Sequence, residues 1–251
     1  MPPRFSRETK HTVLFSTGSP EYQMRTSACE RRCPAGNSIQ RVHSLIQEGN
    51  FEEALNILKA TNPFPGVTGR VCHHPCESGC NRKHFDEPVS IRTLERAASD
   101  YGSGARRIIG IDKTGKTAAI IGAGPAGLTC AYFLSLLGHE VTLFESLPVL
   151  GGMPRVAIPD GTLPKEIVDR EVARIIELGV TVKINTSVGK DVLFEEVTGR
   201  YGACLVATGV RRPREQMSRT PDSEFFKRAI GLQVTSRGTL KVDPFTLATG
   251  R

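Results

Sequence analysis

Residues 117–146, TAAIIGAGPAGLTCAYFLSLLGHEVTLFES, decide the fold that we expect for this chain. A short apolar run is followed by the pattern Gly122-x-Gly124-x-x-Gly127, and a second apolar run ends at Glu145. This order predicts a strand, a tight turn, a helix and a second strand. In dinucleotide-binding units of this type the glycines let the backbone approach a pyrophosphate, and the acid binds a ribose hydroxyl. We therefore predict a dinucleotide site at this turn.

Two other interpretations of the same stretch have to be weighed. A lone glycine pattern of this kind occurs by chance, but here both flanking strands and the acid are present. Residues 117–138 are also long and apolar enough to suggest a membrane helix. Three internal glycines and Pro125 argue against a membrane span.

Composition allows one large or two modest domains with ordinary globular content: 251 residues, 39% hydrophobic and 24% charged. A net charge of +7 favours an acidic partner, such as a ferredoxin-like protein, or a phosphate-rich cofactor. A solvated basic surface explains the charge equally well. Nucleic acid is disfavoured because no stripe of basic and aromatic residues is present. The start MPPRFSRETK lacks the apolar region of a secretory signal, so we expect a cytoplasmic protein.

Seven cysteines are unevenly spread, with five of them in residues 29–80. Such clustering without a secretory signal indicates metal ligation rather than disulfides. The Cys-Pro pair at Cys33 and the three-residue spacers favour iron–sulfur ligation. Structural zinc is the alternative, with His73 and His74 as further ligands. Cys130 and Cys204 stand apart and are expected to be core thiols.

Apolar residues at helical spacing between the cysteine clusters predict an all-α domain. The expected helices cover residues 39–46, with Ser38 as N-cap, 51–58 and 91–98. Gly49 and Asn50 separate the first two helices.

The segments NPFPGVTGRVCHHPCESGC (62–80) and EPVSIRTLERAASD (87–100), followed by the glycine turn, resemble one family. It includes the small subunit of bacterial glutamate synthase, the N-terminal part of dihydropyrimidine dehydrogenase and the large subunit of NADH-dependent ferredoxin:NADP oxidoreductase. The resemblance extends over roughly residues 28–251. It implies an α/β fold in which an all-α iron–sulfur domain precedes an FAD-binding Rossmann-type domain.

The resemblance implies two 4Fe–4S clusters, but the early cysteine pair of the first is missing, which would leave Cys29 and Cys80 as orphaned ligands. We expect one 4Fe–4S cluster. An all-cysteine set that recruits Cys29 or Cys80 is the rival, and a surface role for the acidic residue is another alternative. Cys29 and Cys80 could also form a free pair, a disulfide or half of a cluster that a partner completes. The expected ligands are Cys33, Cys72, Cys76 and Glu95.

The resemblance also implies that the dinucleotide is FAD, and the Gly-Gly pair soon after the acid is typical of flavoproteins with two dinucleotide domains. Pro164 is expected at position N1 of a helix, and residues 180–184 as a strand. Residues 204–209 are expected to form a buried strand that runs into a turn beneath the cofactor. The expected cofactor-binding residues are Gly122, Gly124, Pro125, Ala126, Gly127, Glu145, Ser146, Gly151, Gly152, Met153, Val188, Ala207, Thr208 and Gly209.

Where the family has a second Rossmann domain for NAD(P)H, this chain passes directly to Ser218-Arg219-Thr220-Pro221. Either that domain was lost, or it is absent from the sequence as given; we favour the latter. The expected divisions are an N-terminal arm (1–28), a helical 4Fe–4S domain (29–110), the first part of the FAD domain (117–215), and the end of the NAD(P)H domain with the return to the FAD domain (216–251).

We predict an oxidoreductase that passes electrons between NAD(P)H, FAD and the cluster to a partner subunit or redox protein. The cofactors supply the chemistry, so no catalytic side chain is expected. The alternatives are a non-catalytic FAD and iron–sulfur relay or scaffold subunit of a larger complex, and a zinc-stapled flavoprotein.

Overall fold

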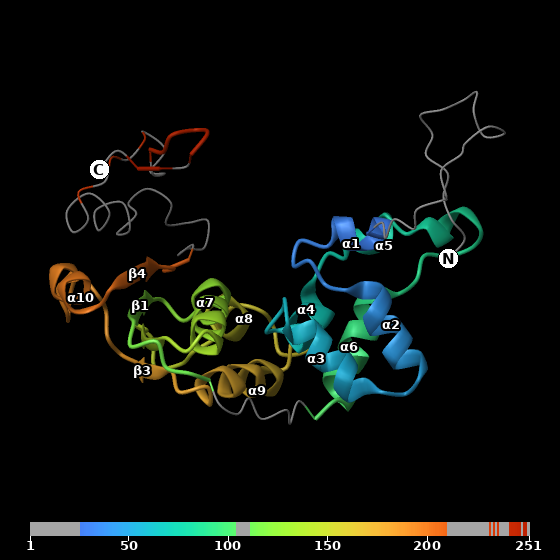
Figure 1. Ribbon diagram of the computed structural model, residues 1–251, viewed down its shortest axis with the longest axis horizontal. Coiled ribbons are helices and arrows are strands. Elements are labelled where there is room, and N and C mark those ends of the chain that lie inside the picture. The colour runs from blue at the N-terminus through green and yellow to red at the C-terminus, as the bar shows by residue number, and fades with distance from the viewer. Residues whose placement is uncertain are drawn as a thin grey trace, which may run out of the picture.

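The computed structural model describes residues 26–103 and 111–209, together with 231, 233, 235, 241–246 and 248–249 (Figure 1). A helical part comes first and a part built on a sheet follows, as the sequence predicted. The α/β fold class with a preceding helical domain is therefore confirmed. Of the predicted N-terminal arm, residues 1–25 lie outside the described residues.

The helical part forms because short amphipathic segments bury one face each. Ile39 and Val42 are buried from one helix, and Leu55 and Leu58 from the next. The side chain of Asn50 caps this second helix by accepting a hydrogen bond from the backbone N–H of Glu53 (3.2 Å). The elements are α1 (Ala28–Arg32), α2 (Ile39–Gln47), α3 (Phe51–Lys59), α4 (Pro65–Val71), α5 (Pro75–Ser78), the 3₁₀ helix η1 (Asn81–His84) and α6 (Ile91–Tyr101).

The second part is a parallel four-stranded sheet with the strand order β3-β2-β1-β4. Helices connect successive strands, as parallel pairing requires. The strands are β1 (Thr117–Ile121), β2 (Glu140–Phe144), β3 (Thr181–Lys183) and β4 (Ala203–Val206), and the helices are α7 (Pro125–Leu136), α8 (Met153–Val156), α9 (Lys165–Ile176) and α10 (Phe194–Arg200).

Successive side chains of the strands point to opposite faces of the sheet and pack into two apolar layers. Ile120 and Leu143 pack with residues of α7 and α9 on one face of the sheet. Ile121 and Phe144 pack with α10 on the other face. Both faces of β1 are therefore buried, which explains its continuous apolar sequence.

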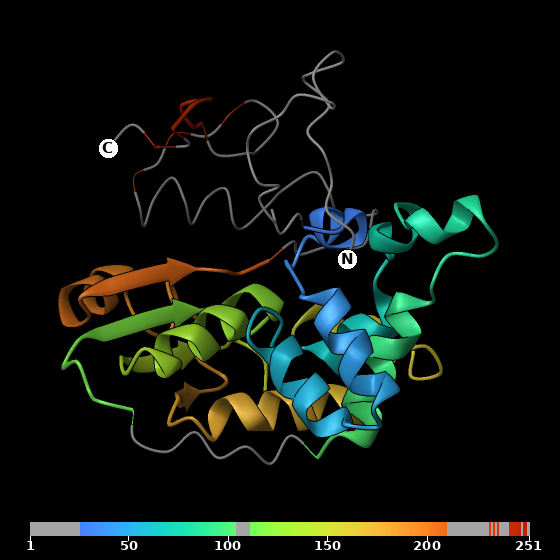
Figure 2. The ribbon, with the colours of Figure 1, turned by 45° about the vertical axis from the view of Figure 1, so that its right-hand side comes forward.

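Phe64 and Val67 of the helical part belong to the same apolar cluster as Leu128 and Val168 of the sheet part. Figures 1 and 2 show α9 running beneath the sheet toward the helical part. One continuous core therefore joins the two parts. No described helix has the length and apolar character that crossing a membrane would need.

Three sequence predictions need correction. The strand in residues 204–209 is not buried: Leu205 is 37% exposed, because β4 pairs only with β1 among the described strands. Pro164 is the N-cap of α9 rather than its first residue, with an extended backbone. Ser38 precedes α2 as predicted but makes no side-chain capping hydrogen bond.

The predicted return of residues 216–251 to the FAD domain falls largely outside the described residues. Within the described part of that segment, Val242 forms an isolated antiparallel bridge with Thr249 and joins no strand of the sheet. The return to the sheet remains a prediction.

Candidate functional site

The turn after β1 is shaped by glycines that have no room for a side chain. A Cβ on Gly127 would lie 2.0 Å from the carbonyl oxygen of Gly122, so the start of α7 presses directly on the turn. Gly122 has a φ of +107°, and its N–H donates to the carbonyl oxygen of Phe144 (2.8 Å). Gly124 differs, because nothing lies within 4 Å of the position where its Cβ would stand. The open space is therefore at the middle glycine, in front of the helix.

Gly124 is the N-cap of α7 and offers no side-chain acceptor, and Pro125 follows at the first helical position. Pro125 and Ala126 are exposed. The free N–H groups and the positive end of a 12-residue helix thus face open space. This is the arrangement that binds pyrophosphate in dinucleotide sites.

Two further predicted segments meet this turn. The N–H of Gly151 donates to the carbonyl oxygen of Ala123 (2.8 Å), and a Cβ on Gly152 would lie 2.6 Å from the Cα of Gly124. On the other side, a Cβ on Gly122 would lie 2.4 Å from the carbonyl oxygen of Ala207. The structure therefore brings the segments at 122–127, 151–153 and 207–209 together, although long stretches of chain separate them.

Glu145 is 7% exposed and lies at the end of β2 beside the turn. Its Oε2 accepts a hydrogen bond from the N–H of Ala123 (2.8 Å), and its Oε1 accepts from the N–H of Leu147 (2.9 Å) and from the hydroxyl of Ser146 (3.2 Å). The carboxylate is thus fixed by donors next to the glycine turn, where a ribose would come.

The other predicted cofactor residues are less closely engaged. Met153 is 53% exposed at the start of α8, and Gly209 is exposed with a φ of +72°. Thr208 is half-buried, and its Cα would lie 3.1 Å from a Cβ on Gly122. Val188 is buried in the layer under α10, on the other face of the sheet from α7.

The predicted metal ligands lie at one end of the helical part. Cys33 follows α1, Cys72 follows α4, and Cys76 lies on α5, which packs against α1. Cys76 packs in a small apolar cluster with Cys29 and Cys33. As the side chains stand, no three His, Cys, Asp or Glu residues among residues 26–103 and 111–209 are close enough together to hold a metal ion.

Glu95 is the most informative of these residues. It is 7% exposed, so the surface interpretation of this acid is wrong. The neighbouring Arg92 and Arg96 point elsewhere, to the carbonyl oxygen of Cys72 (3.1 Å) and the carboxylate of Asp100 (3.2 Å). In the described part of the chain Glu95 forms no ion pair, and it accepts one hydrogen bond, from the side-chain amide of Asn37 (2.8 Å). Burial raises its pKa.

The pKa of the Cys76 thiol is raised as well. Burial, together with the charge of Glu95, raises the pKa of Cys76 to about 12. Buried anionic donors without a cation are costly, and binding of a metal displaces the thiol proton and supplies the missing positive charge. The chemistry of these donors, though not their spacing as the side chains stand, suits a cationic cluster iron. All cysteines are free thiols, which rules out the disulfide alternative for Cys29 and Cys80 in the structure as described.

Sequence reasoning missed Asn37. It is 2% exposed, its amide donates to Glu95, its oxygen accepts from the hydroxyl of Thr61 (3.0 Å), and its backbone N–H lies 3.5 Å from the sulfur of Cys33. The N–H of His74 similarly lies 3.3 Å from the sulfur of Cys72. Hydrogen bonds to ligand sulfurs tune iron–sulfur sites. No periodicity in the sequence marks Asn37, because its partners are distant along the chain.

Two family models match the chain. Residues 22–106 match "dihydropyrimidine dehydrogenase domain II, 4Fe-4S cluster", and residues 120–173 match "NAD(P)-binding Rossmann-like domain". The two matches coincide with the helical part and with the first βαβ unit and α9.

Curated relatives cover most of this chain. The chain is 41% identical over 209 residues to the NADP(+)-dependent formate dehydrogenase subunit beta of Moorella thermoacetica, covering 74% of this chain and 30% of that protein. It is 40% identical over 194 residues to the NADPH-Fe(3+) oxidoreductase subunit beta of Geobacter sulfurreducens, covering 75% of this chain and 29% of that protein. It is 37% identical over 195 residues to the glutamate synthase [NADPH] small chain of Bacillus subtilis, covering 76% of this chain and 40% of that protein. The chain spans less than half the length of these relatives.

Proposed function

We propose that this chain, which belongs to the family of the glutamate synthase small chain and its related beta subunits, is the FAD and iron–sulfur part of an electron-transferring oxidoreductase. It would serve as one subunit of a complex and act between NAD(P)H and a partner subunit or redox protein. The observation that carries the proposal is the continuous core of Phe64, Val67, Leu128 and Val168. This core packs the cysteine-bearing helical part against the sheet part that carries the glycine turn.

The turn and its two neighbouring segments support FAD as the dinucleotide. The N-terminus of α7 would bind the pyrophosphate, and Glu145 would orient the adenosine ribose. The Gly151-Gly152 loop lies on the turn and excludes side chains from the path of the cofactor. Backbone at Ala207 and Thr208 closes the other side of the turn.

In the helical part Cys33, Cys72, Cys76 and Glu95 would hold one 4Fe–4S cluster. The cofactors would supply two-electron and one-electron chemistry respectively when bound. The chain's own residues position the two groups: α4 and α6 fix Cys72 and Glu95, and N–H groups at Asn37 and His74 face the ligand sulfurs. The NAD(P)H site would lie on the second Rossmann domain of the family, which is absent from the sequence as given.

The test is the cofactor content of the purified protein. We expect bound FAD, iron and acid-labile sulfide, with iron lost in Cys76→Ser and retained in the matched Cys204→Ser, whose thiol lies in the sheet part. Protein with neither flavin nor iron disproves the proposal. A bound metal that is colourless and lacks iron favours the zinc alternative.

The second candidate is a relay or scaffold subunit without its own reductase activity. Assay of NAD(P)H:dye reduction separates the two, because a relay is reduced only through its partner. We also infer a cytoplasmic location, which the free thiols of all seven cysteines support.

A further inference from the structure

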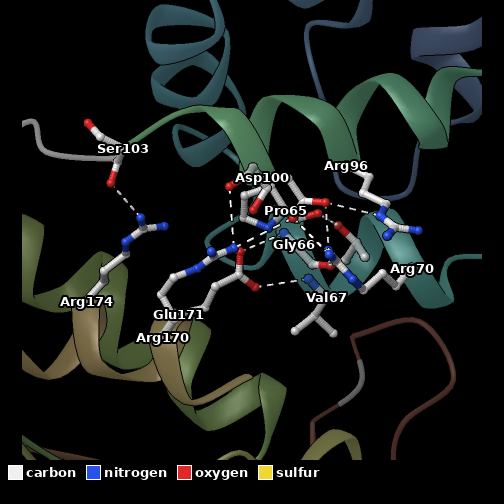
Figure 3. A network of polar contacts seen from close by, with 12 residues as sticks. Pro65, Gly66, Val67, Arg70, Arg96, Asp100, Ser103, Arg170, Glu171 and Arg174 are labelled. Atoms are coloured by element: carbon white, nitrogen blue, oxygen red, sulfur yellow. Dashed lines mark hydrogen bonds and ion pairs between the residues drawn. The ribbon is translucent and has the colours of Figure 1, made fainter. Parts of the chain in front are cut away.

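A buried carboxylate of the sheet part caps a helix of the helical part. Glu171, on α9, is 1% exposed. Its Oε1 accepts a hydrogen bond from the N–H of Gly66 (2.6 Å), and its Oε2 accepts one from the N–H of Val67 (3.1 Å), as Figure 3 shows. These are the second and third residues of α4, whose own N-cap, Phe64, has no side-chain acceptor. Glu171 therefore supplies from another part of the molecule the cap that the local sequence lacks.

A predicted cluster ligand lies at the C-terminal end of α4. Cys72 is the C-cap of this helix, and its N–H donates to the carbonyl oxygen of Thr68 (2.9 Å). Because α4 has only seven residues, it spans about 10 Å. Only about two turns of helix separate its first turn from Cys72. A displacement of the first turn would therefore also displace Cys72.

Close backbone contacts make α4 stiff against α6, the helix that carries Glu95. A Cβ on Gly69 would lie 2.8 Å from the Cα of Arg96, and a Cβ on Gly66 would lie 2.7 Å from the hydroxyl oxygen of Ser99. At these two glycines α4 therefore cannot move closer to α6. The two hydrogen bonds from its first turn to Glu171 restrain the start of the helix.

The neighbouring cations do not neutralise Glu171 by direct pairing. Arg170 donates to the carbonyl oxygen of Ser99 (3.4 Å). Arg174 donates to the carbonyl oxygen of Ser103 (2.6 Å), as drawn in Figure 3. Asp100 is held by Arg70 (2.8 Å) and Arg96 (3.2 Å). Glu171 is thus a buried carboxylate whose described hydrogen bonds go to backbone N–H groups alone. A buried charge is a weak source of stability, and its best-attested benefit is a fixed arrangement.

We propose that Glu171 is a positioning residue for the iron–sulfur ligand Cys72: from the flavin-binding part it fixes the start of α4 and thereby the place of this ligand relative to the dinucleotide turn. The proposal rests on the proposed function. It assigns the coupling between the two cofactor sites to one carboxylate rather than to the apolar core alone.

The experiment compares Glu171→Gln and Glu171→Asp with the wild type in the full chain at pH 8, and uses Glu166→Gln as matched control on the exposed side of α9. The amide of Gln presents an N–H₂ group to one of the two backbone donors, and Asp is one methylene too short to reach both. We expect amide hydrogen exchange at Gly66 and Val67 to become about tenfold faster, the effect of leaving one N–H unpaired. We also expect the EPR spectrum and midpoint potential of the reduced cluster to shift at unchanged iron content, while the flavin potential stays constant.

A cluster with wild-type EPR spectrum and potential in both variants overturns the proposal, as does failure of both variants to fold, which would make Glu171 a residue of stability only. Changes of the same size in Glu166→Gln also overturn it. Absence of iron from the wild type is a separate result, because it disproves the proposed function itself.

Discussion

At the scale of single residues, burial separates a ligand from a surface acid. Glu95 follows Arg92 at helical spacing and precedes Arg96, so the sequence alone allows an exposed acid paired with arginines. The structure instead places Glu95 in the interior with Asn37 as partner, 58 positions away in the chain. Such a contact depends on the packing of α2 against α6, and no local pattern predicts it.

Glu95→Ala tests the fourth cluster ligand. We expect iron and acid-labile sulfide to fall severalfold, because a buried anionic donor would be replaced by a methyl group. Glu95→Cys restores a donor, so it should retain iron with an altered EPR spectrum. The control is Glu87→Ala at an exposed position before α6, which should keep its iron. Full iron content with an unchanged EPR spectrum in Glu95→Ala would mean that Cys29 or Cys80 completes the set.

Glu171 should make stability depend on pH. Burial raises its pKa from 4.5 to about 7, against the opposing effect of the N–H groups of Gly66 and Val67. Between these values the folded protein holds a proton that the unfolded chain has released, so the free energy of unfolding falls as the pH rises. The difference reaches about 3 kcal/mol and is complete above pH 7.

Urea unfolding of the wild type and of Glu171→Gln at pH 5 and pH 7.5 measures this effect. The wild type should lose stability relative to the variant over this range, since Gln does not titrate. The groups around Glu171 are Arg170 and Arg174 on α9, Asp100 on α6 and Lys59 on α3, whose pKa is lowered to about 8 by burial and by Arg174. These groups are present in both proteins, so their own contributions to the pH dependence of stability cancel when the wild type is compared with the variant. Parallel curves for the two proteins would contradict the prediction.

At the scale of elements, the turn between β1 and α7 separates binding from folding. Gly124→Ala places a methyl group in open space at a φ of −79°, which any residue adopts. We expect the protein to fold normally and to bind FAD at least about tenfold more weakly, since the methyl group would lie where the pyrophosphate comes. Equilibrium titration of FAD into the apoprotein measures the loss.

Gly127→Ala is the matched variant within the same turn. Its Cβ would lie 2.0 Å from the carbonyl oxygen of Gly122, so it should destabilise the fold itself by about 1–3 kcal/mol. The apoprotein of this variant should melt lower than the wild type, whereas that of Gly124→Ala should not. Equal melting temperatures for the two apoproteins would contradict the prediction that Gly127 is needed for folding and Gly124 for cofactor binding.

Periodicity predicted the long elements well and the short ones poorly. The apolar spacings at 39–46, 51–58 and 91–98 correspond to α2, α3 and α6, and the segment 117–146 to β1, α7 and β2. The five-residue α1 was not predicted, although Ser27 and Glu30 form the capping box that marks its start. Exposure of β4 could not be predicted, because it depends on which strands stand next to it.

At the scale of the whole molecule, the family and the order of the two parts were predicted and are confirmed by the matches at 22–106 and 120–173. The way in which the parts are joined was not predicted. It depends on Glu171 reaching α4 and on Phe64 entering the core of the sheet part, contacts over about a hundred positions of chain. Neither residue stands out in the sequence, since one belongs to an amphipathic helix and the other to a loop.

The shared core predicts that the two parts unfold together. Phe64 is 7% exposed and packs in the cluster that contains Leu128 and Val168, so Phe64→Ala removes apolar contact from both parts at once. We expect a loss of about 3–5 kcal/mol, which corresponds to roughly 6–20 °C in melting temperature for a chain of this size. Phe85→Ala, at a side chain that is 91% exposed, is the control and should leave the melting temperature unchanged. Absorbance on heating follows both flavin release and bleaching of the cluster. In Phe64→Ala the temperatures of the two events should fall together. A fall of one temperature without the other would mean that the cysteine-bearing helices and the sheet unfold as independent units, and that the shared core does not fix the two cofactor sites relative to each other.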